Sequence, residues 1–343
     1  MTTERKKEFQ RNTDLEHLLH EINHMLHPAN EDLKRNAPEN FTKLFVMGGL
    51  RSGTTLFMQW LAATGLVAYP TNMLSRFYGA PLAGAKIQQL LADPRYNFRN
   101  EIMDFTSSIN FSSDNGKTRG ALAPNEFWYF WRRFLPFTDL DYLPDAELAA
   151  QGNLAGLRDE LNALANIFEK PFALKGMIVN QNIPAINALF GKALFVWVYR
   201  DPVFNIQSVL EARQRQFGTI NTWYSFKIRE YPQLKDLDPL QSAAGQIHAI
   251  NHAIETAFKA LPDERKLMVP YEDFCQQPAT YHSAIVSKLT AQQGIHHGPH
   301  PYTGEARFDH TNVWRLKEYT QAQAEEAYRQ CVTGAANSNG TPT

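Results

Sequence analysis

The sequence lacks a cysteine framework, a net charge and any long apolar run. Its two cysteines, Cys275 and Cys331, are too few for a disulfide scaffold or a cysteine-ligated metal site. With 34 lysines and arginines against 35 aspartates and glutamates, the net charge of -1 gives no general basic surface for nucleic acid or an anionic membrane. No apolar run approaches the ~20 residues that span a bilayer, and residues 1–19 are too polar for a signal peptide. We therefore expect a soluble, cytoplasmic protein without a transmembrane segment or a nucleic-acid partner.

The composition is that of an ordinary folded chain. Hydrophobic residues make up 43% of the 343 residues, with 19 glycines and 19 prolines. Apolar residues recur at helical spacing over residues 14–26, which predicts an amphipathic helix capped by Asp14, ended near Pro28 and packed on the main domain. We expect this helix and a linker in residues 1–40, one domain in 41–333, and a disordered tail in 334–343, which is mostly Gly, Asn, Ser, Thr and Ala.

Short apolar runs alternate with helical patterns along the main domain. Strands are predicted at residues 44–47, 172–179, 193–199 and 267–270, and helices at 54–63, 184–190, from 202 onward and at 239–261. This alternation predicts a three-layer α/β/α fold with a central parallel sheet, in which ligands bind at the carboxyl ends of the strands. Residues 70–169 are a mostly helical insertion without clear strand runs, and this is the natural place for a lid over an acceptor.

A glycine-rich loop follows the first predicted strand: Gly48-Gly49-Leu50-Arg51-Ser52-Gly53-Thr54-Thr55. Glycines let successive backbone N–H groups turn toward an anion, and the N-terminus of the next helix adds positive partial charge. The loop nearly matches the phosphate-binding pattern G-x-x-x-x-G-K-[ST], but Thr54 replaces the lysine and the loop's cation is Arg51. No Asp or Glu occurs between Glu39 and Asp93, so the local field is positive. The alternative is an ordinary glycine turn with chance charge statistics.

A second anion-binding pattern follows the predicted strand at 193–199. Arg200 stands at the end of this strand and can offer two parallel hydrogen bonds to a phosphate. Asp201 and Pro202 are a helix cap and a first-turn proline, and Ser208 lies two turns further along the same helix face. Arg-Asp-Pro alone is a weak signal, but it gains weight beside the first loop.

Together the two patterns resemble sulfotransferases that use 3′-phosphoadenosine-5′-phosphosulfate (PAPS), a family with a P-loop NTPase-like fold. In that family a loop written [KR]-S-G-T-T binds the 5′-phosphosulfate, and an arginine at a strand end holds the 3′-phosphate with a serine eight residues later. Residues 51–55, Arg200 and Ser208 match this pattern. Weaker matches are Lys175, residues 271–274 (Tyr-Glu-Asp-Phe) and Trp314-Arg315.

The resemblance implies PAPS as donor, adenosine 3′,5′-bisphosphate (PAP) as product, and no metal. Sulfuryl transfer is similar to phosphoryl transfer, in which the protein positions the reactants and neutralises charge on the leaving oxygen. Arg51 and the N–H groups of the loop would stabilise the departing 5′-phosphate, and Lys175 joins Arg51 among the expected catalytic residues. The expected donor-binding residues are Arg51, Ser52, Gly53, Thr54, Thr55, Arg200, Ser208 and Arg315.

Transfer also needs a base to take the acceptor's proton. No histidine occurs between His27 and His248, so a histidine base is excluded unless a later one folds back. The carboxylate candidates are Glu101, Asp104 and Glu126. Glu126 is favoured because the aromatic run that follows it, residues 127–131, would raise its pKa toward neutrality. Alternatively, Glu126 is only a first-turn carboxylate favoured by the helix dipole.

The sequence indicates less about the acceptor than about the donor. Five consecutive aromatic residues at 127–131 cannot share one helix face, so some should meet an acceptor cleft or solvent. An arginine loop with a carboxylate base resembles the branch that sulfates carbohydrates and tyrosyl proteins, which favours a glycan or another small-molecule alcohol. The sequence leaves the oligomeric state open.

Three other interpretations compete with this one. Residues 20–24 (His-Glu-Ile-Asn-His) match the zinc-hydrolase pattern H-E-x-x-H, but the histidines of this helix lie opposite its apolar stripe, so we expect them to face water. A P-loop kinase-like phosphotransferase is the principal alternative, because one loop can hold either donor. A protein that binds the donor without catalysis is a third class.

Overall fold

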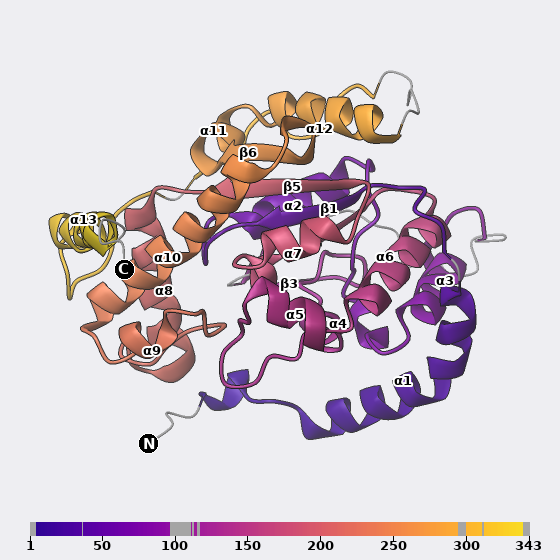
Figure 1. The fold of residues 1–343 in the computed structure, drawn as a ribbon, viewed down its shortest axis with the longest axis horizontal. Helices are drawn as coiled ribbons and strands as arrows, with labels where there is room; N and C mark the ends of the chain where they lie inside the picture. Colours follow the sequence, from indigo (N-terminus) through magenta and orange to yellow (C-terminus); the bar gives the residue numbers. More distant parts are fainter. Residues whose placement is uncertain are drawn as a thin grey trace.

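The computed structural model describes residues 5–35, 37–96, 111, 113–114, 117–293, 300–310 and 312–338. Its centre is a four-stranded sheet in which every pair of neighbours is parallel (Figure 1). The strand order is β4 (Phe172–Lys175), β1 (Lys43–Met47), β5 (Ala193–Tyr199) and β6 (Lys266–Pro270). The predicted parallel sheet is confirmed, and the carboxyl ends of all four strands therefore lie along one edge.

Helices of very different lengths surround the sheet (Figure 1). The α-helices are α1 (Thr13–Lys34), α2 (Thr54–Ala63), α3 (Pro81–Ala92), α4 (Trp128–Arg132), α5 (Asp145–Gln151), α6 (Leu154–Phe168), α7 (Ile183–Ala188), α8 (Pro202–Phe217), α9 (Tyr231–Leu234), α10 (Pro239–Ala260), α11 (Tyr271–Gln276), α12 (Pro278–Gln293) and α13 (Gln321–Ser338). Short 3-10 helices are η1 (Lys7–Phe9), η2 (Leu74–Phe77), η4 (Met177–Val179) and η5 (Asp263–Arg265). None of the helices in the described ranges is both long and apolar enough to cross a membrane.

Side chains alternate between two buried faces of the sheet. Leu44 and Val46 of β1 pack in an apolar cluster with residues of α2, α11 and α12. Phe45 and Met47 pack in the cluster on the other face, which includes residues of α6, α8 and α10. Figure 1 shows α11 and α12 on one side of the strands and α8 and α10 on the other. The fold is thus the predicted three-layer α/β/α arrangement, which buries both faces of a parallel sheet.

Three segments differ from the sequence-based expectation. The strand predicted to reach residue 179 ends at Lys175, and Gly176 then leads into η4. A side chain at Gly176 would place its Cβ 2.5 Å from the Met47 sulfur, so glycine lets the chain turn against β1. The insertion contains a short antiparallel pair, β2 (Ser113–Asp114) and β3 (Lys117–Thr118). Helix α13 continues to Ser338, past the point where fraying was expected, since one internal glycine costs a helix only about 1 kcal/mol.

Helix α1 is longer than predicted and is attached by polar contacts. It begins one residue earlier, with Asn12 as the cap, and passes through Pro28 to Lys34. Buried Asn30 holds the turn beyond Pro28, because its amide donates to Glu160 Oε1 and its oxygen accepts from the Leu82 N–H, both at 2.8 Å. These two bonds help the helix to continue despite the N–H that proline lacks.

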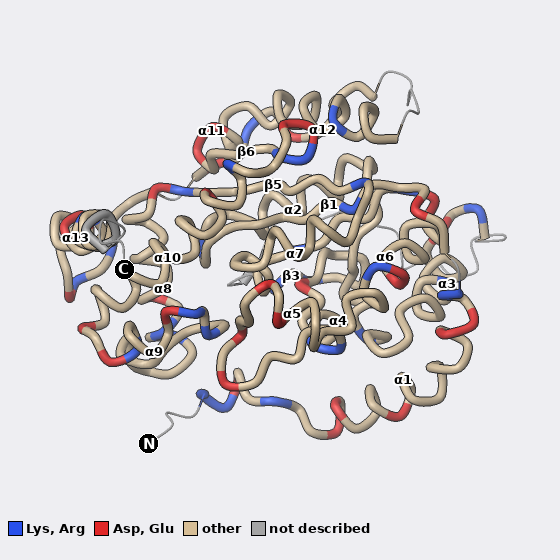
Figure 2. The backbone as a smooth tube through the Cα atoms, in the orientation of Figure 1, with Lys and Arg blue, Asp and Glu red and all other residues tan. Residues whose placement is uncertain are grey.

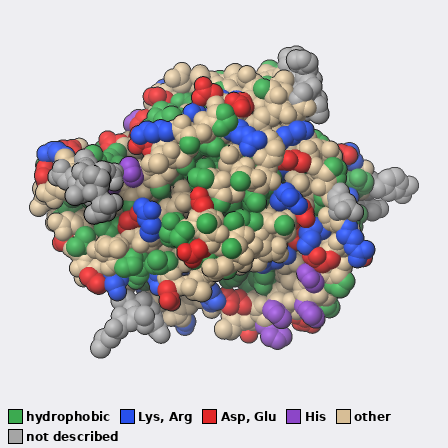
Figure 3. All heavy atoms as spheres, viewed as in Figure 1, with side chains coloured by type: hydrophobic (Ala, Val, Ile, Leu, Met, Phe, Trp, Pro, Cys, Tyr) green, Lys and Arg blue, Asp and Glu red, His purple; other side chains and the backbone are tan. Residues whose placement is uncertain are grey.

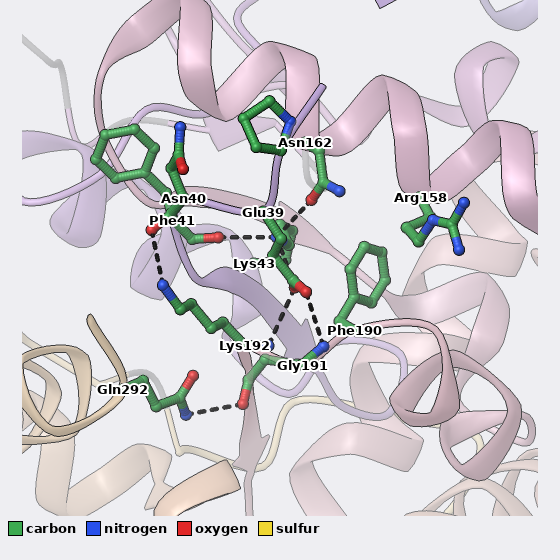
Figure 4. Close-up of polar contacts among 12 residues, drawn as sticks. Glu39, Asn40, Phe41, Lys43, Arg158, Asn162, Phe190, Gly191, Lys192 and Gln292 are labelled. Carbon is green, nitrogen blue, oxygen red and sulfur yellow. Dashed lines mark hydrogen bonds and ion pairs between the residues drawn. The ribbon is translucent and has the colours of Figure 1, made fainter. Parts of the chain in front are cut away.

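A buried ion pair ties together the amino ends of two strands (Figure 4). Lys43, at the start of β1, is fully buried, and its Nζ lies 2.9 Å from Glu39 Oε1 and 2.6 Å from Asn162 Oδ1 on α6. The Glu39 carboxylate in turn accepts the N–H groups of Gly191 and Lys192, just before β5. Burial lowers the pKa of Lys43 to about 8, although Glu39 opposes this shift. The linker, β1, α6 and β5 are therefore joined through one carboxylate and one ammonium group.

Elsewhere charges of both signs are interspersed along the chain (Figure 2).

Replacing Glu39 with glutamine is expected to lower the free energy of unfolding by about 3 kcal/mol, because the buried Lys43 ammonium loses the one anion that pairs with it among the described residues. Urea denaturation followed by circular dichroism measures this loss. Glu255→Gln is the matched control, since Glu255 and Lys259 have the same spacing of four residues but are 50% and 71% exposed. The control should change stability by less than 1 kcal/mol, or about the value of a surface ion pair. Equal losses in the two variants would contradict a structural role for the buried pair.

Candidate active site

The glycine-rich loop is held open by asparagines from distant segments. The side chain of Asn180 pairs with the backbone of Gly48, accepting its N–H at 3.2 Å and donating to its carbonyl at 2.7 Å. Asn205 of α8 donates to the Leu50 carbonyl at 2.8 Å. These two asparagines fix the loop between β1 and α2, and no sequence motif pointed to either.

The N-terminus of α2 has the features of an anion site. Gly53 caps the helix in a left-handed conformation (φ 93°). No side chain in the described part of the chain caps it, so the first-turn amides lack the usual partner. The buried Ser52 hydroxyl has no hydrogen-bond partner within the described residues. Thr54 Oγ1 contacts the Met177 sulfur at 3.8 Å, and Thr55 Oγ1 accepts from Lys175. A bound phosphate or sulfate group would satisfy donors that the fold leaves unpaired.

The two predicted anion-binding segments meet in one place. Arg51 Nε donates to Ser208 Oγ on α8 at 2.9 Å. Arg200 Nη1 lies 3.4 Å from the Arg51 carbonyl oxygen. The residues chosen from two motifs about 150 positions apart therefore line one continuous surface at the carboxyl ends of β1 and β5.

The Arg200 guanidinium is positioned by partners that the sequence did not reveal. Its Nε and Nη2 donate to Asn312 Oδ1 at 2.8 and 2.5 Å, and the Asn312 amide donates to Glu272 Oε1 at 2.6 Å. Arg200 also lies 5.2 Å from the centroid of the Tyr271 ring. Burial lowers the pKa of Arg200, Tyr271 and Glu272 oppose this shift, and the neighbouring cations Arg51 and Arg315 add to it. An anion at this point would relieve the repulsion among three arginines.

Arg315 lies on the outer side of the same region. Its backbone N–H donates to Gln207 on α8, and its guanidinium pairs with Glu211 one turn further along, at 3.1 Å. The side chain is exposed. The structure thus places Arg315 next to the α8 face that carries Ser208, with its charge turned toward Glu211.

Lys175 and Glu126 form an ion pair beside the loop. Lys175 is the last residue of β4, and its Nζ donates to Thr55 Oγ1 at 2.7 Å and to Glu126 Oε1 at 2.9 Å. The indole N–H of Trp128 donates to the other Glu126 oxygen at 2.6 Å. Glu126, which belongs to the insertion, is therefore linked to Thr55 of the glycine-rich loop by the Lys175 ammonium group. Glu101 and Asp104 lie outside the described residues.

The expected rise in the pKa of Glu126 is wrong. Burial raises this pKa, but Lys175, the Trp128 indole and the positive charge of Arg51 outweigh burial and hold it below the ordinary value. The helix-dipole alternative is also wrong, because Phe127 turns the chain in a left-handed conformation (φ 59°) and α4 begins only at Trp128. Glu126 is thus an ionised carboxylate held by two donors.

The aromatic run divides between the core and the site. Phe127, Phe130 and Trp131 are at most 1% exposed, whereas Tyr129 is 43% exposed. Trp128 lines a crevice too narrow to hold a water molecule, together with Glu126, Trp131, Lys175, Met177 and Ile178. The residues that line this crevice include no histidine. The exposed Tyr129 confirms the expectation that some aromatic side chains of the run leave the core.

Tyr224 feels the charges of two site residues. Burial raises the pKa of its phenol, the charge of Arg51 lowers this pKa, and the charge of Glu126 raises it. The following residue, Ser225, has a φ of 73°. Of the four described non-glycine residues with positive φ, Arg51 lies in the glycine-rich loop and Phe127 follows Glu126. Such backbone strain is typical of functional sites.

Replacing Gly53 with alanine is expected to destabilise the protein by well over 1 kcal/mol. The added Cβ would overlap the Tyr271 ring, and alanine would have to adopt a positive φ. Gly65→Ala is the matched control, since Gly65 has a φ of 71° but nothing within 4 Å of its Cβ position. The difference between the two losses in urea denaturation isolates the steric part. If the two variants lose the same stability, the close packing of Tyr271 on the loop is not a constraint.

Comparison with known proteins agrees with this site. A model of the sulfotransferase family matches residues 43–292, which include the loop, Lys175, Arg200 and Ser208. No curated protein matches the chain significantly. Among solved structures, a sulfotransferase from Mycobacterium avium (STF9) shares the fold, with a TM-score of 0.53, 18% identity, and coverage of 92% of this chain and 81% of that one.

A sulfotransferase from Mycobacterium tuberculosis H37Rv (STF1) aligns less closely, with a TM-score of 0.49 and 14% identity over 91% of this chain and 81% of that one. The fold is P-loop NTPase-like, as the resemblance to PAPS-dependent sulfotransferases implied. Because the family model spans most of the chain and contains the residues that meet at the sheet edge, the chain belongs to the sulfotransferase family.

Proposed function

We propose that this protein transfers a sulfuryl group from PAPS to the hydroxyl group of a small-molecule acceptor. The observation that carries the proposal is the junction of the two anion-binding segments, where Arg200 reaches the Arg51 carbonyl and Arg51 reaches Ser208. PAPS carries anionic groups at both the 5′ and the 3′ position of one nucleoside. A site with two adjoining cationic segments suits such a donor better than it suits a nucleotide charged at one end.

The donor's two ends have different partners in this proposal. The 5′-phosphosulfate lies on the N-terminus of α2, bonded by the loop amides of Gly53, Thr54 and Thr55 and by the unpaired Ser52 hydroxyl. The 3′-phosphate lies against Arg200 and Ser208. One of the Arg200 N–H groups that donate to Asn312 Oδ1 donates to this phosphate instead. Arg315 adds positive potential from outside the site.

The chemical step is an in-line displacement at sulfur. The acceptor oxygen forms a new bond to sulfur while the bond from sulfur to the 5′-phosphate oxygen breaks, and its electron pair leaves with PAP. Arg51 and Lys175 neutralise the charge that develops on the leaving oxygen. The acceptor's proton passes to the Glu126 carboxylate, which is ionised and therefore able to accept it.

Lys175 couples the donor to the base. Its ammonium group bridges Thr55, in the donor loop, and Glu126, on the acceptor side. When the donor arrives, its anionic sulfuryl group competes with Glu126 for this ammonium group. Weakening of the Lys175–Glu126 pair raises the pKa of Glu126, so the carboxylate becomes a stronger base when the donor is present.

The acceptor proposed here is a carbohydrate-type or other aliphatic alcohol. Its hydroxyl group approaches Glu126 from the side of Trp128, whose indole offers an apolar face for a sugar ring or an alkyl group. A carboxylate base beside an aromatic side chain supports an alcohol acceptor. The resemblance to carbohydrate sulfotransferases points the same way.

The variant Arg200→Ala is expected to lose about 100-fold of the protein's preference for PAP over adenosine 5′-monophosphate. Loss of the charged hydrogen bonds to the 3′-phosphate costs about 2.7 kcal/mol. Isothermal titration calorimetry with both nucleotides measures the preference. Arg329→Ala, which removes a surface arginine on α13, is the control and should keep it.

An Arg200→Ala variant that kept the preference would contradict the assignment of the 3′-phosphate site. A wild-type protein that bound magnesium ATP better than PAP would favour the kinase alternative.

The variant Glu126→Gln is expected to bind PAP like the wild type but to transfer sulfate roughly 10²- to 10⁴-fold more slowly, because an amide cannot accept the acceptor's proton. Transfer is measured with labelled PAPS and a metabolite extract of the host. Glu16→Gln is the control, since Glu16 is a carboxylate that contacts Tyr129 of α4 outside the crevice. Undiminished transfer by Glu126→Gln would exclude Glu126 as the base. Tight PAP binding with no transfer by the wild type would favour a binding protein.

A further inference from the structure

Helix α1 carries a row of histidines that the sulfuryl-transfer site does not use. His17, His20, His24 and His27 are all exposed, and they fall within a sector of about 80° at 100° per residue. The helix is held to the molecule by Asn23, which lies about 80° around the helix from the centre of this sector and bonds the backbone of residues 76, 79 and 80. Figure 3 shows histidine side chains gathered on the part of the surface over α1. The sequence-based expectation that they face water is confirmed.

Two of these histidines have the arrangement of a chelating pair. His20 and His24 lie one helical turn apart, with ring centroids 6.5 Å apart and ring planes within 5° of parallel. Neither ring takes part in a hydrogen bond or ion pair within the described residues. Metal–nitrogen bonds of about 2.0–2.1 Å require the two rings to converge only slightly. Exposed side chains reach this geometry by small rotations, because no neighbouring group holds the rings.

We infer that His20 and His24 form a surface site for a divalent transition metal such as Zn²⁺, Ni²⁺ or Cu²⁺. Imidazole nitrogen is a good ligand for these ions and a poor one for Mg²⁺ or Ca²⁺, which prefer oxygen. The site depends only on the geometry of α1 and is independent of the proposed sulfuryl transfer.

The ligand set distinguishes this site from the zinc-hydrolase motif that the same residues spell. No group of three or more His, Cys, Asp or Glu side chains suited to a metal occurs in the described part of the chain. The nearby Glu16 carboxylate is engaged with Tyr129 and Arg11. Two protein ligands leave the remaining positions of the ion to water, so the ion is held at the surface without a catalytic pocket.

A second histidine pair in the chain provides a matched control. His248 and His252 on α10 have the same spacing of four residues, with ring centroids 5.8 Å apart. However, His248 is half-buried and packs edge-on against Tyr328 of α13, 5.8 Å away. The packing of α13 on α10 holds this ring, so the second pair should bind metal much less well.

The test uses the full chain without a purification tag. The wild type should be retained on a Ni²⁺-iminodiacetate column and elute at a distinctly raised imidazole concentration, and both Zn²⁺ and Ni²⁺ should raise its melting temperature while Mg²⁺ does not. The double variant His20→Asn/His24→Asn should elute with the unretained fraction and lose the metal-induced shift. The variant His248→Asn/His252→Asn should behave like the wild type.

Circular dichroism and the melting temperature without metal establish that the variants are folded. Three results would overturn the site: a wild type that is not retained, a His20/His24 variant that is retained as well as the wild type, or loss of retention in the His248/His252 variant instead. Because none of these measurements involves PAPS or an acceptor, failure of the metal site and failure of the proposed function are separate outcomes.

Discussion

The parallel pairing of β1 with β5 is the constraint on which the site depends. Neighbouring strands lie about 4.8 Å apart, and their register pairs Met47 with Trp197, so both chains leave the sheet at the same edge. The glycine-rich loop and Arg200 therefore begin within reach of one another, although they are 150 residues apart in sequence. With β4 on the other side of β1, Lys175 enters from the opposite flank. Three neighbouring strand ends thus supply three cations to one place.

Charge, rather than apolar burial, determines the state of the residue proposed as the base. An aromatic neighbourhood alone would favour a protonated carboxyl group, but Lys175 and the Trp128 indole bind both oxygens of Glu126 and favour the ionised form. The same lysine contacts the donor loop through Thr55. In the proposed mechanism this cation is shared between Glu126 and the anionic donor, so the basicity of Glu126 depends on the arrival of the donor. This gives a physical reason for a family member to place a lysine, instead of an apolar residue, at the end of β4.

The local parts of this structure could be predicted from sequence, and the long-range polar contacts could not. Helix α2 and strand β5 have the predicted bounds, because an apolar run or a helical pattern between turn residues is a local signal. The glycine-rich loop and Arg200 stand out in the sequence because their residue types and spacing are those of phosphate-binding segments.

By contrast, Asn180 and Asn312 are ordinary polar residues until the fold brings them to Gly48 and Arg200, 132 and 112 residues away. The ion pair of Glu126 with Lys175 cannot be predicted from sequence for the same reason. Without this pair the aromatic neighbours of Glu126 predict a raised pKa, whereas the structure gives a lowered one.

The two edges of the sheet divide stability and function between them. At the amino edge, Lys43 is buried but fully bonded to Glu39, Asn162 and a backbone carbonyl, so its burial joins segments without leaving an unsatisfied charge. At the carboxyl edge the buried Ser52 hydroxyl has no hydrogen-bond partner in the described residues, and the backbone of Arg51 adopts a left-handed conformation. Each such feature costs about 1–3 kcal/mol. A fold can retain them only where other contacts are well satisfied, and it benefits from them only where a ligand supplies the missing partner. The unsatisfied edge is therefore the one at which the donor should bind.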